Sequence, residues 1–240
     1  MNETVIKRVV EGIVTETKPY LDKKASPHKN IVQVLARKTV DELDLSMFDE
    51  SRKAELLDEL GDEYLKRGHL NDASKAYLLG NHFKKLNLIA ESYERVLDFE
   101  KAIETYNIAD NKERISELGK KCLKESNFKP AIEAFRVLND VEALRDVGNV
   151  CIARGKWDLA FEVFEFVKDN KMLEKVGNAA IEQDDINLAI KAFNIIDSKD
   201  SLNRVAEICL NQNKIKLAIK AFEMAGNKVM LEFIKTNFGK

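Results

Sequence analysis

Cysteine and long apolar segments are both scarce in this chain. Among 240 residues there are only 3 cysteines, an odd number. Together with an amino terminus that lacks the cationic start and apolar core of a signal peptide, this argues for a reducing, cytoplasmic setting. No apolar run approaches the roughly 18 residues that span a bilayer, so we expect no membrane span.

An excess of charge of either sign is also missing. The formal net charge is -2, with 33% charged and 45% hydrophobic residues. This balance suits a soluble globular or repeat protein, and it gives no reason to expect nucleic acid or a membrane surface as a partner.

Catalytic and metal-binding motifs are absent from the sequence. It contains no nucleophile elbow, P-loop, HExxH motif or Gly-rich dinucleotide fingerprint. The three cysteines, Cys122, Cys151 and Cys209, occupy one position of a repeat described below, which predicts neighbours about 10 Å apart. That separation is too large for a single zinc ion, so we interpret them as core residues. We therefore expect no enzymatic activity, no cofactor and no metal.

What the chain does contain is one pattern that returns at a constant step of 29 in residue number, as from Leu57 to Leu86 and from Leu86 to Ile115. The first copy consists of Leu57, Leu60, Gly61, Tyr64, Leu70, Ala73 and Tyr77. Further full copies begin at Leu86, Ile115, Leu144, Leu173 and Leu202, and a seventh begins at Leu231 and stops after Phe238. A fixed period of about 20–50 residues indicates a solenoid or array of stacked units.

Each repeat is predicted to be two helices joined by a short turn, because its apolar residues recur three or four apart. The third position of the pattern accepts only glycine or alanine, at Gly61, Ala90, Gly119, Gly148, Gly177 and Ala206. Such small residues predict a close helix crossing. Helix-ending residues recur at Asn81, Asp110, Asn139, Lys168, Asp197 and Gly226, and N-cap residue types follow at Asn111, Asp140, Asp169, Ser198 and Asn227.

The segment before the repeats has its own pattern. Residues 1–20 and residues 28–45 are each predicted to be helical, with a polar connector at 23–27. Asp49 is predicted to cap a helix that runs through Lys66. We expect an N-terminal helical pair or cap at 1–50, six repeats at 51–227 and a C-terminal capping helix at 228–240.

The repeat resembles the tetratricopeptide repeat (TPR), whose Leu-Gly, Tyr, Ala and aromatic positions it matches in spacing. The family unit has about 34 residues, whereas the step in this chain is 29. All of the shortening falls after the aromatic residue of the second helix. Short second helices of this kind also resemble those in the solenoids of vesicle-coat and intraflagellar-transport subunits. The resemblance implies an all-α, right-handed α-solenoid of helix-turn-helix (TPR-like) repeats.

In TPR proteins one face of the first helices lines a binding groove. The resemblance places Lys120, Lys124, Arg145, Asn149 and Asn178 on this face. Arg145, Asn149 and Asn178 also resemble the family's carboxylate clamp, although Asn203 and Glu207 stand where its next basic residues would be. The alternative interpretation of these residues is an ordinary solvated face.

We therefore predict a non-catalytic protein-interaction scaffold that holds a peptide or helix of a protein partner, with an acidic segment among the candidates. An alternative is a structural subunit of a larger assembly that uses the ends or edges of the solenoid, including self-association through the N-terminal helices. An RNA-binding repeat ranks last, because the aromatic residues occupy core positions and are not available for stacking on bases.

Overall fold

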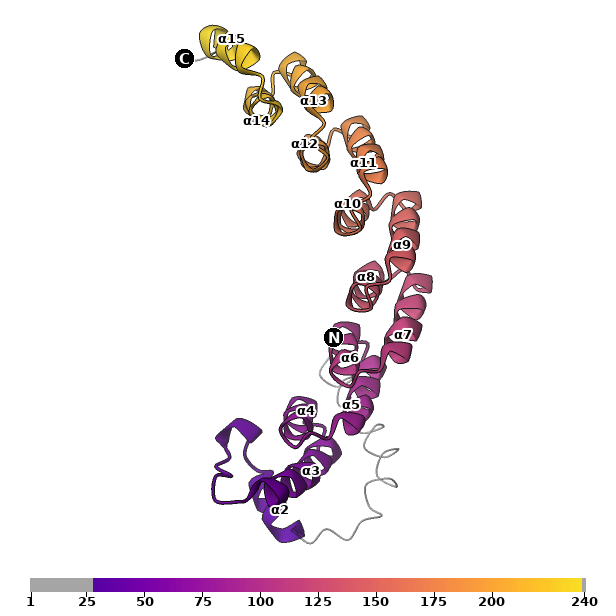
Figure 1. The fold of residues 1–240 in the computed structure, drawn as a ribbon, viewed down its shortest axis with the longest axis vertical. Coiled ribbons are helices and arrows are strands. Elements are labelled where there is room, and N and C mark those ends of the chain that lie inside the picture. The colour runs from indigo at the N-terminus through magenta and orange to yellow at the C-terminus, as the bar shows by residue number, and fades with distance from the viewer. Residues whose placement is uncertain (1–27, 239–240) are drawn as a thin grey trace. The chain divides into compact units, whose positions relative to one another are not determined.

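The computed structural model describes residues 28–238, which contain fourteen α-helices, one 3-10 helix and no strand (Figure 1). The helix predicted at 1–20 and the connector predicted at 23–27 lie outside these residues. The described chain divides into two compact units, one ending at Glu125 and the other beginning at Ser126. Each unit is described by itself.

The first compact unit begins with a short helix and continues with long and short helices in alternation. Its elements are α2 (Lys29–Leu35), the 3-10 helix η1 (Val40–Glu42), α3 (Glu50–Lys66), α4 (Leu70–Leu79), α5 (Phe83–Arg95), α6 (Phe99–Ile108) and α7 (Lys112–Lys124). In this unit α3 packs on α4 and α5 packs on α6, so each pair forms one repeat.

The second compact unit continues the alternation. Its elements are α8 (Phe128–Val137), α9 (Val141–Ala153), α10 (Trp157–Phe166), α11 (Asn170–Glu182), α12 (Ile186–Ile195), α13 (Lys199–Asn211), α14 (Ile215–Ala225) and α15 (Lys228–Phe238). Figure 1 shows the first helices of the repeats, α9, α11 and α13, in one row and the second helices, α8, α10, α12 and α14, in another.

In three repeats, those of Gly61, Gly148 and Gly177, an aromatic ring on the second helix lies against the glycine of the first helix. A Cβ atom added to Gly148 would lie 2.6 Å from Cζ of Phe164, and one added to Gly177 would lie 2.8 Å from Cζ of Phe193. Both rings are fully buried. The predicted close crossing is therefore confirmed, and its partner is the aromatic residue of the same repeat.

Every helix from α3 to α14 is followed by a residue with a left-handed backbone conformation. At Lys168, for example, φ is 54°, and the next N–H, that of Asp169, donates to the carbonyl oxygen of Phe164 at 2.9 Å. Equivalent bonds to the aromatic residue close α4, α6, α8, α12 and α14. These are Schellman-type ends, which satisfy carbonyl groups that a helix terminus leaves without partners. The predicted helix-ending positions are confirmed.

The predicted N-caps are confirmed except at Ser198. The side chains of Asn111, Asp140, Asp169 and Asn227 accept the backbone N–H three residues ahead, at 3.0–3.2 Å. The Ser198 hydroxyl instead donates to Oγ of Ser201 at 2.9 Å. The shorter serine side chain is here satisfied by a neighbouring hydroxyl group.

The helix predicted at 28–45 is wrong beyond Leu35. The chain leaves the helix there, and two side chains bind the carbonyl groups of the following turn. Tyr64 Oη, on α3, donates to the carbonyl oxygen of Lys38 at 2.6 Å, and Nη1 of Arg67, the C-cap residue of α3, donates to the carbonyl oxygen of Ala36 at 2.6 Å. The η1 turn then buries Val40, whose N–H donates to Asp72 Oδ1 at 3.1 Å. Contacts with α3 and α4 therefore override the local helical pattern.

The prediction of an all-α solenoid of TPR-like helix-turn-helix repeats is confirmed by this arrangement. Successive helix pairs recur with the period of the sequence pattern and bury the same pattern positions. None of the helices within residues 28–238 has both the length and the apolar character that a bilayer crossing requires.

Candidate functional site

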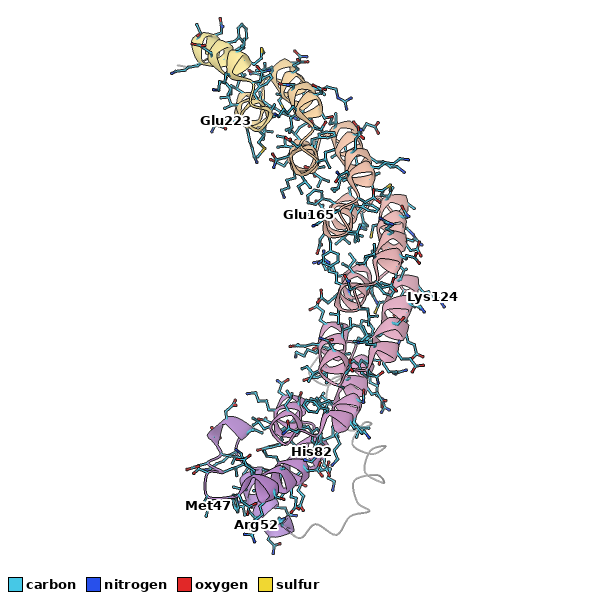
Figure 2. The ribbon with its side chains drawn as sticks, viewed as in Figure 1. Met47, Arg52, His82, Lys124, Glu165 and Glu223 are labelled. Atoms are coloured by element: carbon cyan, nitrogen blue, oxygen red, sulfur yellow. The ribbon has the colours of Figure 1, made fainter. Side chains whose placement is uncertain are left out.

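The five residues predicted to bind a partner lie on first helices, in two different compact units. Lys120 and Lys124 are exposed on α7 of the first unit, and Figure 2 shows Lys124 on the side of α7 that faces away from α6. Arg145 and Asn149 are exposed on α9 of the second unit, and Asn178 is half-buried on α11. The second unit therefore brings three of the five onto neighbouring first helices.

Arg145 contacts the next repeat as well as solvent. Its side chain is 51% exposed, and its Nε lies 3.5 Å from Oδ2 of Asp169. Asp169 caps α11 by accepting the N–H of Met172 at 3.2 Å. The guanidinium group therefore sits beside the start of α11, and its exposed edge still offers N–H donors to solvent or a ligand.

The contact from Arg145 to Asp169 belongs to a recurring set of polar pairs, all with the same separation in sequence. In each pair a first-helix side chain meets the N-cap residue of the next first helix. The pairs are Asp58 with His82 at 3.7 Å, Asn87 with Asn111 at 2.8 Å, Arg145 with Asp169 at 3.5 Å and Asn203 with Asn227 at 2.8 Å. These polar pairs were not predicted from the sequence, although the complementary residue types at one constant spacing could have revealed them.

Asn178 is held by a residue that the sequence analysis did not select. Arg204 Nη2, on α13, donates to Asn178 Oδ1 at 2.5 Å. Arg204 is exposed. The family's carboxylate clamp has basic residues at the positions of Asn203 and Glu207. In this chain the same repeat supplies a basic side chain at Arg204 instead. The face of α9, α11 and α13 thus carries Asn149 and Asn178 together with two guanidinium groups.

The first compact unit contains two polar clusters of a kind that the second lacks among its equivalent positions. Tyr77 Oη donates to Asp62 Oδ1 at 2.6 Å, and Lys85 Nζ, from the next repeat, reaches the same oxygen at 2.6 Å. Burial, followed by the charge of Asp62, raises the pKa of the Tyr77 hydroxyl far above its ordinary range. A similar cluster lies one repeat later, where Tyr106 and Arg114, at the positions of Tyr77 and Lys85, both donate to Glu94 Oε1. In the second unit the aromatic position is phenylalanine, as at Phe164.

These clusters link repeats and are unsuited to nucleophilic chemistry. A tyrosine hydroxyl that donates to a carboxylate and has a raised pKa stays protonated near neutral pH. Lys85 also lies over the Tyr77 ring at 5.3 Å from its centroid, which adds a cation–π contact between repeats. We interpret both clusters as couplings between neighbouring repeats.

The three cysteines are buried, as their pattern position predicts. Burial raises the pKa of Cys122 and Cys151 to about 11 and also raises that of Cys209. Within residues 28–238 no group of three or more His, Cys, Asp or Glu side chains is arranged to hold a metal ion. The thiols therefore have the properties of core residues.

A hollow of about 280 Å³ lies between the α9–α10 turn and the α11–α12 turn. Its lining includes Lys156, Trp157, Asp158 and Asp185. Asp185 is already used as the N-cap of α12, where it accepts the N–H of Leu188 at 3.1 Å. The hollow mixes charges of both signs with one indole ring, and it contains no nucleophile paired with a base.

Comparisons with known proteins add little to this geometry. No protein-family model matches the chain, and no curated protein matches it. Among solved structures, it is similar to a chain of the crystal structure of the APC/C hetero-tetramer Cut9-Hcn1, with 16% identity and a TM-score of 0.27 over 93% of this chain and 48% of that one. It is also similar to a circular tandem repeat protein with novel repeat topology and enhanced subunit contact surfaces, with 17% identity and a TM-score of 0.15 over 98% of this chain and 50% of that one.

This chain thus spans about half the length of each matched chain. With TM-scores this low, neither match bears on what the chain binds, and the TPR-like fold rests on the helices described above.

Proposed function

We propose that the chain is a non-catalytic protein-interaction scaffold whose first-helix face binds an acidic or carboxylate-ended segment of a protein partner. The observation that carries the proposal is the set of donors on α9, α11 and α13 of the second compact unit. Arg145 and Asn149 are exposed there, and Arg204 lies against Asn178 at 2.5 Å. Guanidinium groups bind carboxylates through paired N–H donors, and amide side chains bond to peptide groups.

In the first compact unit, taken by itself, we propose that Lys120 and Lys124 also contribute to binding. They are four residues apart on α7 and therefore share one face of that helix. Both are exposed. A lysine is a flexible point charge, so these two side chains suit a general attraction to acidic segments, whereas the guanidinium groups of the second unit suit a defined carboxylate geometry.

A photo-crosslinking experiment tests this proposal. p-Benzoylphenylalanine placed at Asn149 is expected to crosslink a protein partner, because Asn149 is exposed on α9, one helical turn after Arg145. The matched position is Asn213, which is exposed in the turn between α13 and α14. Crosslinks to one protein at Asn149 that are missing at Asn213 support the proposal, while identical crosslinks at the two positions contradict it.

A second candidate function, a structural subunit of a larger assembly, is favoured by α15. Val229 is 78% exposed and Phe233 is 49% exposed. The positions equivalent to Val229 are charged in all the preceding first helices, from Glu55 to Asp200, and those equivalent to Phe233 are charged in all but Leu88. Exposed apolar residues at such positions are typical of interaction surfaces. Molar-mass measurement of wild type and a Val229→Ser/Phe233→Ser variant tests this candidate, which requires an assembly that the variant loses.

A further inference from the structure

The second helices of the second compact unit carry a stripe of exposed apolar residues that the pattern of core residues does not require. It consists of Phe166 on α10, Ile195 on α12 and Met224 on α14, which are 43%, 41% and 39% exposed. The three occupy equivalent positions, one repeat period apart, in the last turn of each helix. They belong to helices other than those that carry the first-helix face.

The spacing of this stripe matches one kind of ligand. The helix α12 contacts both α10 and α14, so the three stripe residues lie on neighbouring helices. Packed helices are about 8–10 Å apart. In an α-helix, residues seven apart lie on the same face and are about 10.5 Å apart along the axis. A helix laid across α10, α12 and α14 would therefore present one apolar side chain to each stripe residue.

The charges beside the stripe are unevenly distributed. Four residues before each stripe residue, and hence on the same face, stand Glu162, Lys191 and Lys220. Lys191 and Lys220 are exposed, and Lys216 is exposed one turn before Lys220. The other flank carries Glu165, Asn194 and Glu223, and Figure 2 shows Glu165 and Glu223 on the second-helix side of this unit.

The α10 end of the stripe has a different character. Arg136, from α8, lies over the Phe166 ring at 5.2 Å from its centroid and donates to Glu162 Oε1 at 2.8 Å. Glu162 is therefore already paired, whereas Asp158 and Glu165 on α10 are exposed. The stripe is thus acidic over α10 and predominantly basic over α12 and α14.

From this arrangement we propose that the stripe docks an amphipathic α-helix of a partner protein, with apolar residues seven apart and acidic residues over α12 and α14. Three apolar contacts require about 15 residues of helix, since seven residues span about 10.5 Å. The acids of the partner would meet Lys191, Lys216 and Lys220. Basic residues at its other end would meet Asp158 and Glu165, so the charge gradient fixes the direction in which the helix lies. This surface is independent of the first-helix face of the proposed function.

A designed peptide tests the proposal with the intact chain. The probe is a fluorescein-labelled helical peptide of three heptads, with leucine at positions repeated every seven residues, glutamate beside the leucines in the second and third heptads and lysine in the first. A second probe, used for comparison, has the same leucines but has glutamate and lysine exchanged. Fluorescence anisotropy at low salt is expected to show at least tenfold tighter binding of the first probe. Equal binding of the two probes, or binding of neither, would overturn the proposal.

Variants locate the binding on the stripe. Ile195→Ser/Met224→Ser is expected to weaken binding of the first probe at least tenfold. Lys191→Glu/Lys220→Glu is expected to reverse the preference between the probes. The matched control is Lys171→Glu/Lys199→Glu, which makes the same change of charge at exposed positions on first helices and is expected to leave binding unchanged. An equal loss in the control and the Lys191→Glu/Lys220→Glu variant would overturn the proposal.

Measurement of molar mass distinguishes binding of a partner's helix at the stripe from binding of a second copy of the chain. If the stripe binds a partner's helix, wild type and Ile195→Ser/Met224→Ser are expected to have the same molar mass. A wild-type dimer that these substitutions dissociate would overturn it, since the stripe would then be an interface between copies. Neither result bears on the crosslinking at Asn149, so failure here is distinguishable from failure of the proposed function.

Discussion

Phe164 lies so close to Gly148 that a Cβ atom on the glycine would be 2.6 Å from Cζ of the ring. The two residues belong to α9 and α10, the two helices of one repeat. Two forces compete at such a position. A glycine inside a helix costs about 1 kcal/mol relative to alanine, whereas a side chain forced into a packed contact costs about 1–3 kcal/mol. The contact with the ring is the reason we expect glycine to be the more stable choice here.

The first prediction follows from this competition. Gly148→Ala is expected to lower the free energy of unfolding by about 1 kcal/mol, and Gly148→Leu by about 3 kcal/mol or more, because each added group displaces a fully buried ring. The measurement is urea unfolding followed by fluorescence of Trp157, the single tryptophan, on the neighbouring helix α10. A more stable Gly148→Ala variant would show that helix propensity outweighs the ring contact.

The second prediction concerns Lys168, whose φ of 54° is uncommon for a residue with a Cβ atom. Lys168→Gly is expected to raise the free energy of unfolding by about 0.5–1 kcal/mol, because the left-handed conformation costs a non-glycine residue about 1–2 kcal/mol and glycine loses part of that gain in entropy. Lys168→Ala, which keeps the Cβ atom, is the matched control and should show no gain. Equal stabilities of the two variants in urea unfolding would contradict the prediction.

The third prediction concerns the cysteine thiols. Burial raises the pKa of Cys122 and Cys151 to about 11, so at pH 8 only about one thiol in a thousand is ionised. Because the thiolate is the reactive form, the folded protein is expected to react with a disulfide reagent such as DTNB at least a hundredfold more slowly than the protein in urea. Release of three thiol equivalents at similar rates in the two conditions would refute this expectation.

The fourth prediction is an alkaline transition in the first compact unit. Burial raises the pKa of Tyr64 and Tyr93 to about 12, and those of Tyr77 and Tyr106 are raised further. An unfolded tyrosine ionises near pH 10. The stability contributed by these neutral hydroxyls is therefore fully present below about pH 10 and is lost as the pH rises through the folded-state values.

Absorbance at 295 nm and circular dichroism, recorded over the same pH range, measure this transition. Four of the five tyrosines are expected to ionise only above about pH 11, together with loss of helicity. Ionisation of all five with a midpoint near pH 10, while the circular dichroism remains native, would contradict the burial of these side chains.

The repeats could be predicted from the sequence because their determinants are local. Gly148, Asp169 and Lys168 act within one repeat or its turn, and the constant period aligns them with their equivalents. The contacts between repeats were harder to predict. The contact of Arg204 with Asn178 and that of Arg145 with Asp169 depend on how far each first helix is rotated and shifted against the next, which the period does not specify.

The segment before the repeats shows the same distinction. Residues 36–45 carry a helical pattern. The chain nevertheless turns at Ala36, because Arg67 donates to the carbonyl oxygen of Ala36 and Tyr64 donates to that of Lys38. Such long-range side-chain contacts leave no periodic signal in the sequence. The apolar stripe was missed for another reason: the position of Phe166, Ile195 and Met224 is apolar in every repeat, and sequence alone does not distinguish an exposed apolar column from a buried one.

The interaction-scaffold account is tested most directly by quantitative affinity capture with two variants of equal change in charge. Arg145→Glu/Arg204→Glu reverses the charge at the two guanidinium positions of the first-helix face, on α9 and α13. Lys171→Glu/Lys199→Glu is the control, on the first helices α11 and α13 of the same compact unit. Both must first show wild-type helicity and melting. The account predicts that a partner captured by wild type and by the control at low salt is depleted at least tenfold in the Arg145→Glu/Arg204→Glu variant, because the reversed charges repel an acidic segment. Low salt is used because salt at about 0.1–0.15 M screens exposed charges beyond about 8–10 Å. Capture of the same partner in equal amounts by all three proteins would contradict it.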